Sequence, residues 1–321
     1  MGAVTAPAGP HRPTRQTVLF LHAHPDDEAS STAGSIARAA AEGHRVLVVY
    51  GTNGDHGEIP ADLAPGETVL DRRRSEAEQS ARILGTARVE WLGYADSGMN
   101  GWAENAAPGA FRNADLDEAA GRLATVLDDE RVDVLVCYDS HGGYGHPDHV
   151  QVHRVGHRAA ELAAQRPRLL EVTMNRDAMR RLRDSEMAAA RAQGIVLADD
   201  ATFDPDAPMD DGNPMGTPEA EITWQVDVRD YLDLKRAAMR AHASQVSDIG
   251  YFMSLSPAVF AASFGDEYFI EPGLGPGLRH GWFLDGDPDA PGATEPATDE
   301  DGSMRTDTRE SGDLSDPGGS R

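Results

Sequence analysis

Two short segments of the 321-residue chain combine histidine with aspartate at close spacing around a proline. The first is His22-Ala-His-Pro-Asp-Asp-Glu28, and the second is Gly142-Gly-Tyr-Gly-His-Pro-Asp-His149. Neutral imidazole and carboxylate groups bind divalent metals such as Zn²⁺, and a catalytic zinc has three protein ligands and one position for water. The two segments therefore indicate a hydrolytic metal centre, provided that the fold brings them together.

The candidate metal ligands are two histidines and one carboxylate, His24, His149 and Asp27. Asp26 stands next to a ligand without being needed as one, so it is the candidate general base toward water on the metal. An aspartate ahead of a helix is most often an N-cap, and Glu28 is also open to a purely helix-starting role.

The second segment offers further catalytic groups. His146 is a candidate general acid or oxyanion donor, Asp148 would hold its imidazole in position, and Tyr144 contributes a hydroxyl. Asp148 is also open to a helix-starting role. His153 and His157 continue the helical spacing of His149 and form an alternative metal stripe, although packing or solvated positions explain them more simply.

Apolar runs that alternate with helical patterns predict how these segments are held. The expected strands are 17–23, 45–50, 88–92, 132–138 and 169–173, and the expected helices between them are 30–42, 72–84, 116–129 and 148–164. This alternation predicts an α/β fold, Rossmann-like and doubly wound, with a mainly parallel sheet and helices on both faces. In the order 3-2-1-4-5, the first and fourth strands are neighbours, and the loops after them open a ligand crevice.

The remainder is interpreted as an extension of the same domain. A Pro/Asp-rich loop is expected at 200–220, followed by a strand at 221–228 and a helix at 230–244. We expect a flexible leader at 1–15, a domain at 16–284 and a disordered acidic tail at 285–321. The only cysteine, Cys137, lies in an apolar run and is expected to be buried in a strand.

The charge balance excludes several classes of partner. The chain has 29 basic and 54 acidic residues, a formal charge of −25, which disfavours nucleic acid and anionic lipid. No apolar run approaches a membrane span, and the leader lacks the apolar core of a secretory signal. We therefore expect a cytoplasmic protein with no membrane or nucleic-acid partner; the sequence leaves its oligomeric state open.

The segments 24–28 and 146–149 resemble the two signature motifs of the LmbE-like (PIG-L) N-acetylglucosaminyl deacetylases, and the resemblance covers roughly residues 17–270. It implies a Zn²⁺-dependent amidohydrolase, with Fe²⁺ possible, acting on a small-molecule amino sugar. It also implies the ligand, base and oxyanion roles given above. Arg73 and Asp96 resemble substrate contacts of the mycothiol-pathway deacetylase, against plain alternatives as a solvated helix arginine and a turn residue. His242 resembles part of a late family motif and either lines the pocket or is structural.

Within this resemblance we expect de-N-acetylation of an N-acetylglucosaminyl compound, such as the glucosaminyl-inositol precursor of mycothiol. The alternatives are an amidase of mycothiol conjugates, a deacetylase of another amino sugar, and a non-catalytic carbohydrate-binding protein. The amidase branch has a lysine near the position of Ser31 and a proline at that of Gly145, so this chain is closer to the deacetylases. A dinucleotide oxidoreductase is disfavoured because no Gly-x-Gly-x-x-Gly loop follows the first strand.

Overall fold

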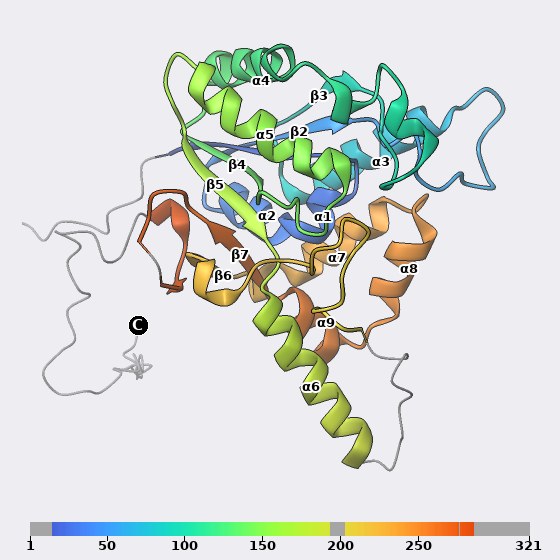
Figure 1. Cartoon of the computed structure of the whole chain (residues 1–321), viewed down its shortest axis with the longest axis vertical. Helices are drawn as coiled ribbons and strands as arrows, with labels where there is room; N and C mark the ends of the chain where they lie inside the picture. Colours follow the sequence, from blue (N-terminus) through green and yellow to red (C-terminus); the bar gives the residue numbers. More distant parts are fainter. Residues whose placement is uncertain (1–14, 193–202, 276, 286–321) are drawn as a thin grey trace, which may run out of the picture. The chain divides into compact units, whose positions relative to one another are not determined.

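The computed structural model describes residues 15–192, 203–275 and 277–285, which are built around an eight-stranded sheet (Figure 1). Its strand order is β3-β2-β1-β4-β5-β7-β6-β8. The strands are β1 (Thr17–His22), β2 (Arg45–Thr52), β3 (Arg88–Tyr94), β4 (Val134–Tyr138), β5 (Arg168–Thr173), β6 (Trp224–Asp227), β7 (Asp266–Ile270) and β8 (Arg279–His280). The strands from β3 to β5 are all parallel, which confirms the predicted order and fold class.

Helices cover both faces of this sheet. Figure 1 shows α4 and α5 together on one side, and α2 and α7 on the other. The helices are α1 (Asp27–Ser31), α2 (Ala33–Ala41), α3 (Val69–Leu84), α4 (Leu116–Glu130), α5 (Pro147–Leu162), α6 (Arg176–Ala192), α7 (Leu232–Ala241), α8 (Val246–Ser254) and α9 (Pro257–Phe264). Because both faces are covered, β1, β2 and β4 are buried almost throughout, as their continuous apolar runs predict. Cys137 is a free, fully buried thiol in β4, as expected.

The predicted C-terminal extension is part of the sheet. Strand β7 lies antiparallel between β5 and β6, so the extension completes one edge. The buried carboxylate of Glu267 in β7 accepts hydrogen bonds of 2.9 Å from the backbone N–H groups of Gly34 and Ser35 at the start of α2. It also pairs with the buried ammonium of Lys235 in α7 at 2.7 Å. This network joins the extension to the first β-α unit.

Several elements differ from the sequence expectation. The helix expected at 30–42 is two helices, α1 and α2, separated at Thr32, whose φ of −132° leaves the helical region. Thr32 is fully buried, and its hydroxyl lies 3.0 Å from Nε2 of His22, which accounts for the break. Helices α6, α8 and α9 and strands β7 and β8 were not predicted. Within the expected loop, residues 203–218 form neither helix nor strand, as predicted.

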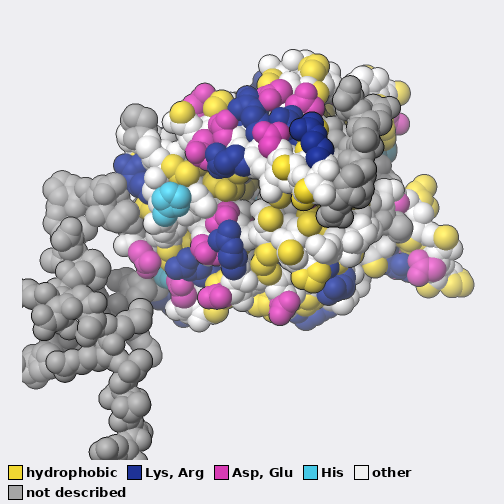
Figure 2. Space-filling model, turned by 90° about the horizontal axis from the view of Figure 1, so that it is seen from below, with side chains coloured by type: hydrophobic (Ala, Val, Ile, Leu, Met, Phe, Trp, Pro, Cys, Tyr) yellow, Lys and Arg dark blue, Asp and Glu magenta, His cyan; other side chains and the backbone are white. Residues whose placement is uncertain are grey.

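Charged side chains of both signs are mixed on the face shown in Figure 2. Several ion pairs of the described residues join distant parts of the chain, such as Arg229 with Asp266 at 2.7 Å. Among the described residues, no helix is long and apolar enough to cross a membrane. Except for Arg15 and Asp285, the predicted leader and acidic tail lie outside the described residues.

Candidate metal centre and active site

The two histidine-aspartate segments meet where β1 and β4 end. These strands are parallel neighbours, with Val18 opposite Val134 and Phe20 opposite Val136. Their carboxyl ends therefore lie at the same edge of the sheet, at the point where strand order reverses. One segment follows β1 and enters α1, and the other follows β4 and enters α5. The two segments therefore meet at the crossover point of the sheet, as predicted.

The loop after β4 is held by the side chain of Asp139 at its start. Asp139 accepts hydrogen bonds from the N–H groups of His141 and Gly143 at 2.9 and 3.0 Å. Gly142 has a φ of +62°, and a Cβ built on it would lie 2.4 Å from the Cβ of His149. Only glycine allows this close approach, which brings the loop against the first turn of α5.

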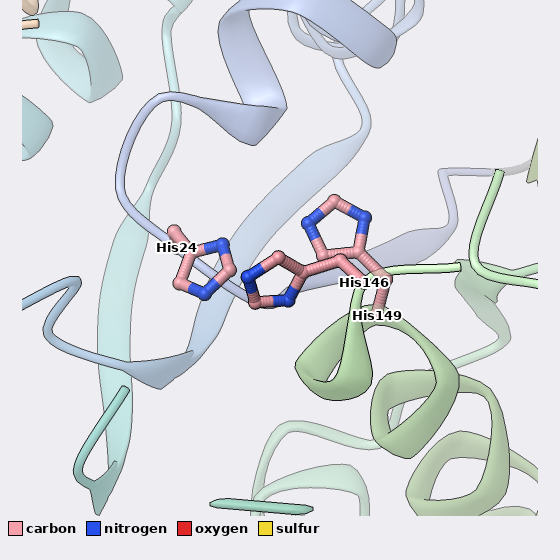
Figure 3. A group of neighbouring side chains, drawn as sticks. All are labelled: His24, His146 and His149. Carbon is pink, nitrogen blue, oxygen red and sulfur yellow. The ribbon is translucent and has the colours of Figure 1, made fainter. Parts of the chain in front are cut away.

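The three predicted ligands come together. Oδ2 of Asp27 lies 3.3 Å from Nδ1 of His24, and its Oδ1 lies 3.4 Å from Nε2 of His149. Figure 3 shows the rings of His24, His146 and His149 facing one another, and one nitrogen of each ring lies within 4.8 Å of the others. Burial alone would raise the pKa of Asp27, but the facing His149 and His24 hold it well below its ordinary value.

The outer contacts of these rings fit a metal site. Nδ1 of His149 lies 3.1 Å from the carbonyl O of Gly142, so its Nε2 is directed at Asp27. Nε2 of His24 lies 3.3 Å from Oδ2 of Asp148, so its Nδ1 is directed at Asp27. Metal-binding histidines typically use their second nitrogen for such a carbonyl or carboxylate bond. Two imidazoles and one carboxylate are donors that suit zinc or ferrous iron.

The contacts of Asp148 correct one prediction. Its carboxylate does not hold His146; it contacts His24, the N–H of Ser97 at 2.8 Å and the hydroxyl of Ser97. Only the backbone N–H of Asp148 reaches His146, donating to Nδ1 at 3.2 Å. The reason is the helix start: His146 is the N-cap of α5, and its side chain turns back onto the first-turn amide.

His146 is therefore held with a defined tautomer. Because Nδ1 accepts a hydrogen bond, the proton of the neutral ring is on Nε2. Burial and the neighbouring His24 and His149 lower the pKa of His146 to about 2. The hydroxyl of Tyr144 lies 3.5 Å from Nε2 of His149, at the same place in the site. A cavity of about 120 Å³ borders this group, lined by Met99, Asn100, Tyr144, Gly145, His146, Met209 and Asp210.

Asp26 occupies a strained backbone position. Its φ of +124° lies in a region that non-glycine residues rarely adopt. Its N–H donates to Oε2 of Glu28 at 3.0 Å, and its Oδ2 lies 2.9 Å from a guanidinium nitrogen of Arg73. Burial raises the pKa of Asp26 to about 6, although the charge of Arg73 opposes the rise. A carboxylate with this pKa is suited to accept a proton near neutral pH.

The side chain of Arg73 is buried behind Asp26. Its side chain is 3% exposed, and it donates to Asp26 and to the carbonyl oxygens of Gly54 and Pro25 at 2.5 Å. Its guanidinium is therefore directed at protein acceptors behind Asp26. This arrangement makes Arg73 a positioning contact for Asp26, and the predicted contact with substrate stays a prediction.

Asp96 is directed at the metal-ligand cluster. Its Oδ1 lies 3.6 Å from Nε2 of His24 and accepts a hydrogen bond of 2.8 Å from the N–H of Gly98. Burial would raise the pKa of Asp96, but His24 and these hydrogen bonds hold it well below its ordinary value. Asp96 and Asp148 thus both face Nε2 of His24, while Asp27 faces its Nδ1. The contact with a sugar hydroxyl stays a prediction.

Comparison with known proteins places this arrangement in a family. A family model described as PIG-L, GlcNAc-PI de-N-acetylase, matches residues 19–160. A 1D-myo-inositol 2-acetamido-2-deoxy-alpha-D-glucopyranoside deacetylase of Acidothermus cellulolyticus is 39% identical over 272 residues, covering 79% of this chain and 88% of the relative. A protein of the same name from Streptomyces avermitilis is 41% identical over 271 residues, covering 78% and 90%. The chain belongs to the PIG-L family. The family prediction is confirmed.

Solved structures share the PIG-L fold at low sequence identity. A40926 pseudoaglycone deacetylase Dbv21 has a TM-score of 0.50 and 15% identity, covering 80% of this chain and 97% of that structure. GalB of Pseudomonas putida, described as a 4-carboxy-2-hydroxymuconate hydratase, has a TM-score of 0.50 and 19% identity, covering 82% and 100%. Because a deacetylase and a hydratase both share it, the fold by itself does not identify the reaction.

One buried group of the PIG-L site was not predicted from the sequence. Glu28 accepts hydrogen bonds from Ser80 at 2.5 Å and lies 2.7 Å from Nε2 of His242, while its other oxygen holds the N–H of Asp26. His242 is fully buried, so the structural interpretation of this histidine is the correct one. Glu28 follows the ligand motif directly, but its partners are far away in the chain and carry no spacing signal.

Proposed function

We propose that this PIG-L protein removes the acetyl group from an N-acetylglucosaminyl compound, with N-acetylglucosaminyl-inositol as its substrate. The single observation that carries the proposal is the convergence of His24, Asp27 and His149 beside a separately anchored carboxylate, Asp26. The substrate is inferred from the relatives, whose name specifies this acetamido sugar on inositol. The products are acetate and the free amine.

The proposed metal is zinc, with ferrous iron as the alternative for the same ligand set. Its ligands would be Nδ1 of His24, Nε2 of His149 and the carboxylate of Asp27. Bound there, the ion would polarise the acetamide carbonyl and increase the acidity of water. Asp148 and the carbonyl of Gly142 would hold the two rings through their other nitrogens.

Asp26 would accept the proton of the attacking water. Arg73 fixes the direction of its carboxylate, and 25% of the Asp26 side chain is exposed, so its free edge is accessible. The proton accepted by Asp26 would then pass to the leaving nitrogen as the carbon–nitrogen bond breaks. His146 is less suited to that step because its pKa is lowered to about 2, which leaves the ring neutral.

His146 and Tyr144 would stabilise the negative oxygen that develops on the acetamide carbon. Nε2 of His146 carries the ring proton, since Nδ1 accepts from the N–H of Asp148. The Tyr144 hydroxyl lies in the same loop, close to His149. Donors held in place before the reaction stabilise such charge without reorganisation.

The loop geometry supports a deacetylase over a conjugate amidase. Gly145 has a φ of +85°, whereas a proline fixes φ near −65°. A Cβ at this position would lie 2.5 Å from the carboxylate carbon of Asp211. The proline of the amidase branch is therefore incompatible with the loop that this chain forms beside His146.

The test is an amine-release assay on the full-length protein. We expect Zn²⁺-loaded protein to release primary amine from N-acetylglucosaminyl-inositol faster than from N-acetylglucosamine or a mycothiol conjugate. A chelator should stop the reaction, and added Zn²⁺ or Fe²⁺ should restore it. Sugar binding without amine release would instead support a carbohydrate-binding protein, and preference for the conjugate would support an amidase.

A further inference from the structure

A second group of metal-binding side chains lies on another part of α5. His153 and His157, together with Glu171 of β5, each place one ligand atom within 4.8 Å of the others. We propose that these three residues form a second binding site for a first-row divalent cation such as Zn²⁺. The site is separate from the centre at His24, Asp27 and His149.

The two histidines are arranged to share an ion. They are four residues apart, so they lie on the same face of α5, and their ring centroids are 4.3 Å apart. One oxygen of Glu171, Oε1, lies 2.6 Å from Nε2 of His157 and 3.6 Å from Nδ1 of His153. Ligand atoms around a tetrahedral zinc are about 3.3 Å apart. The present distances bracket that value, so small side-chain rotations suffice.

The charge of Glu171 also favours a cation here. Glu171 is 8% exposed, and among the described residues the imidazoles of His153 and His157 face its Oε1. A buried carboxylate requires a compensating positive charge. A divalent ion bound between the imidazoles and Glu171 would supply that charge.

An ion can reach the site and complete its coordination with water. The His157 side chain is 33% exposed and that of His153 is 21% exposed. Imidazole with carboxylate selects zinc, copper, nickel or cobalt rather than magnesium or calcium. Nδ1 of His153 also lies 3.0 Å from the carbonyl O of Tyr138, so binding through this atom would exchange that hydrogen bond for a metal bond.

The helix divides its three histidines between two clusters. His149 directs Nε2 at Asp27 and Nδ1 at the carbonyl O of Gly142, which assigns its ring to the first centre. His153 and His157, one and two turns later, are directed at Glu171 instead. The three histidines of α5 therefore do not form a single metal stripe, and Glu171 of β5 completes the second site.

Metal stoichiometry tests this proposal. The stripped full-length protein is dialysed against Zn²⁺, and bound metal is measured by mass spectrometry. We expect His153→Gln/His157→Gln to bind one equivalent fewer than the wild-type chain, whereas His280→Gln, which alters an exposed histidine of β8, should bind the same amount. His24→Gln should weaken the first centre and leave the second intact. Equal stoichiometry for the double variant and the wild type would overturn the proposal.

A thermal-shift measurement covers the possibility that the double variant folds poorly. Glu171→Gln keeps the shape and a hydrogen-bond acceptor but removes the charge, and we expect it to weaken Zn²⁺ binding at this site about tenfold or more. In a His24→Gln background, Zn²⁺ should raise Tm because it binds the native state, and Mg²⁺ should not. Adding Glu171→Gln should remove the Zn²⁺ shift. A Zn²⁺ shift in Tm that persists after Glu171→Gln would show that the ion does not bind through Glu171. No Zn²⁺ shift in the His24→Gln background would show that His153, His157 and Glu171 bind no ion. Either result would overturn the proposal.

Discussion

The buried guanidinium of Arg73 forms an ion pair with the partly exposed Asp26, in which a guanidinium nitrogen and Oδ2 are 2.9 Å apart. The pair is one of three constraints on Asp26, the others being the Glu28 hydrogen bond and the positive φ. An arginine that would be solvated on an ordinary helix surface is buried here because it has three protein acceptors. The orientation of Asp26, the candidate base, therefore depends on Arg73 of α3 as well as on its own motif.

Replacing Arg73 separates positioning from substrate binding. We expect Arg73→Lys to lower kcat about 10- to 100-fold, because the point charge of lysine cannot hold Asp26 and two carbonyls together. KM should change little. Arg74→Lys, on the neighbouring exposed position, is the matched control. A large rise in KM with unchanged kcat would instead support the predicted substrate-contact role and contradict the positioning role.

Replacing Asp26 tests the base directly. Asp26→Asn keeps an oxygen near Arg73 but cannot accept the proton, so kcat should fall about 10²- to 10⁴-fold. Bound metal should be unchanged, since Asp26 is not among the three ligands. Asp27→Asn is the comparison, and it should lose metal together with activity. Near wild-type turnover in Asp26→Asn would exclude the assignment.

His146 provides a pH test. Removing an oxyanion donor should lower kcat about 10²- to 10³-fold in His146→Ala. Because the pKa of His146 is lowered to about 2, the ring is neutral throughout the range above pH 5. The pH profile of kcat/KM should therefore keep its shape in this variant. Loss of one limb of the profile would identify His146 as the general acid instead.

Glu130 makes the stability of the fold depend on acidic pH through its contacts with the first residues of β2 and β3. Hydrogen bonds of 2.7 Å from Arg45 and Arg88 hold the pKa of Glu130 below its ordinary value. Its stabilising contribution is thus present above its unfolded pKa and is lost as the pH falls through the lower folded value. Glu130→Gln should lower the free energy of unfolding by about 0.5–1 kcal/mol at pH 7.

The difference between wild type and Glu130→Gln should shrink below about pH 4, because the Glu130 carboxylate of the unfolded chain becomes protonated there while that of the folded chain is still ionised. Thermal unfolding from pH 7 to pH 3 measures this convergence. Glu186→Gln, at an exposed position of α6, is the control and should be neutral at every pH. A constant difference across the range would contradict the linkage.

The first five strands and their order followed from the sequence because buried parallel strands leave continuous apolar runs between helical periods. The break at Thr32 did not, since it depends on a hydrogen bond to His22 across the core. Strand β7 was also missed: its pairing with β5 joins residues about a hundred positions apart, and its alternating burial is only five residues long.

The convergence of the candidate metal ligands was predictable, because their motifs directly follow β1 and β4 and the expected strand order makes these two strands neighbours. The partners of those ligands were not. Asp148 is two residues from His146 in sequence, yet the turn at the start of α5 directs its carboxylate at His24. Glu28 and His242 are separated by 214 residues in the sequence, and no local pattern predicts a contact over such a separation.

The network around Glu267 has a consequence for engineering. The matched family region ends at residue 160, but Glu267 caps the helix that follows the ligand motif, and His242 reaches the same segment through Glu28. A chimera that exchanged only residues 19–160 with a relative would combine the relative's active-site segments with this chain's Glu267 and His242, which contact those segments. The transplantable unit should instead extend through β7.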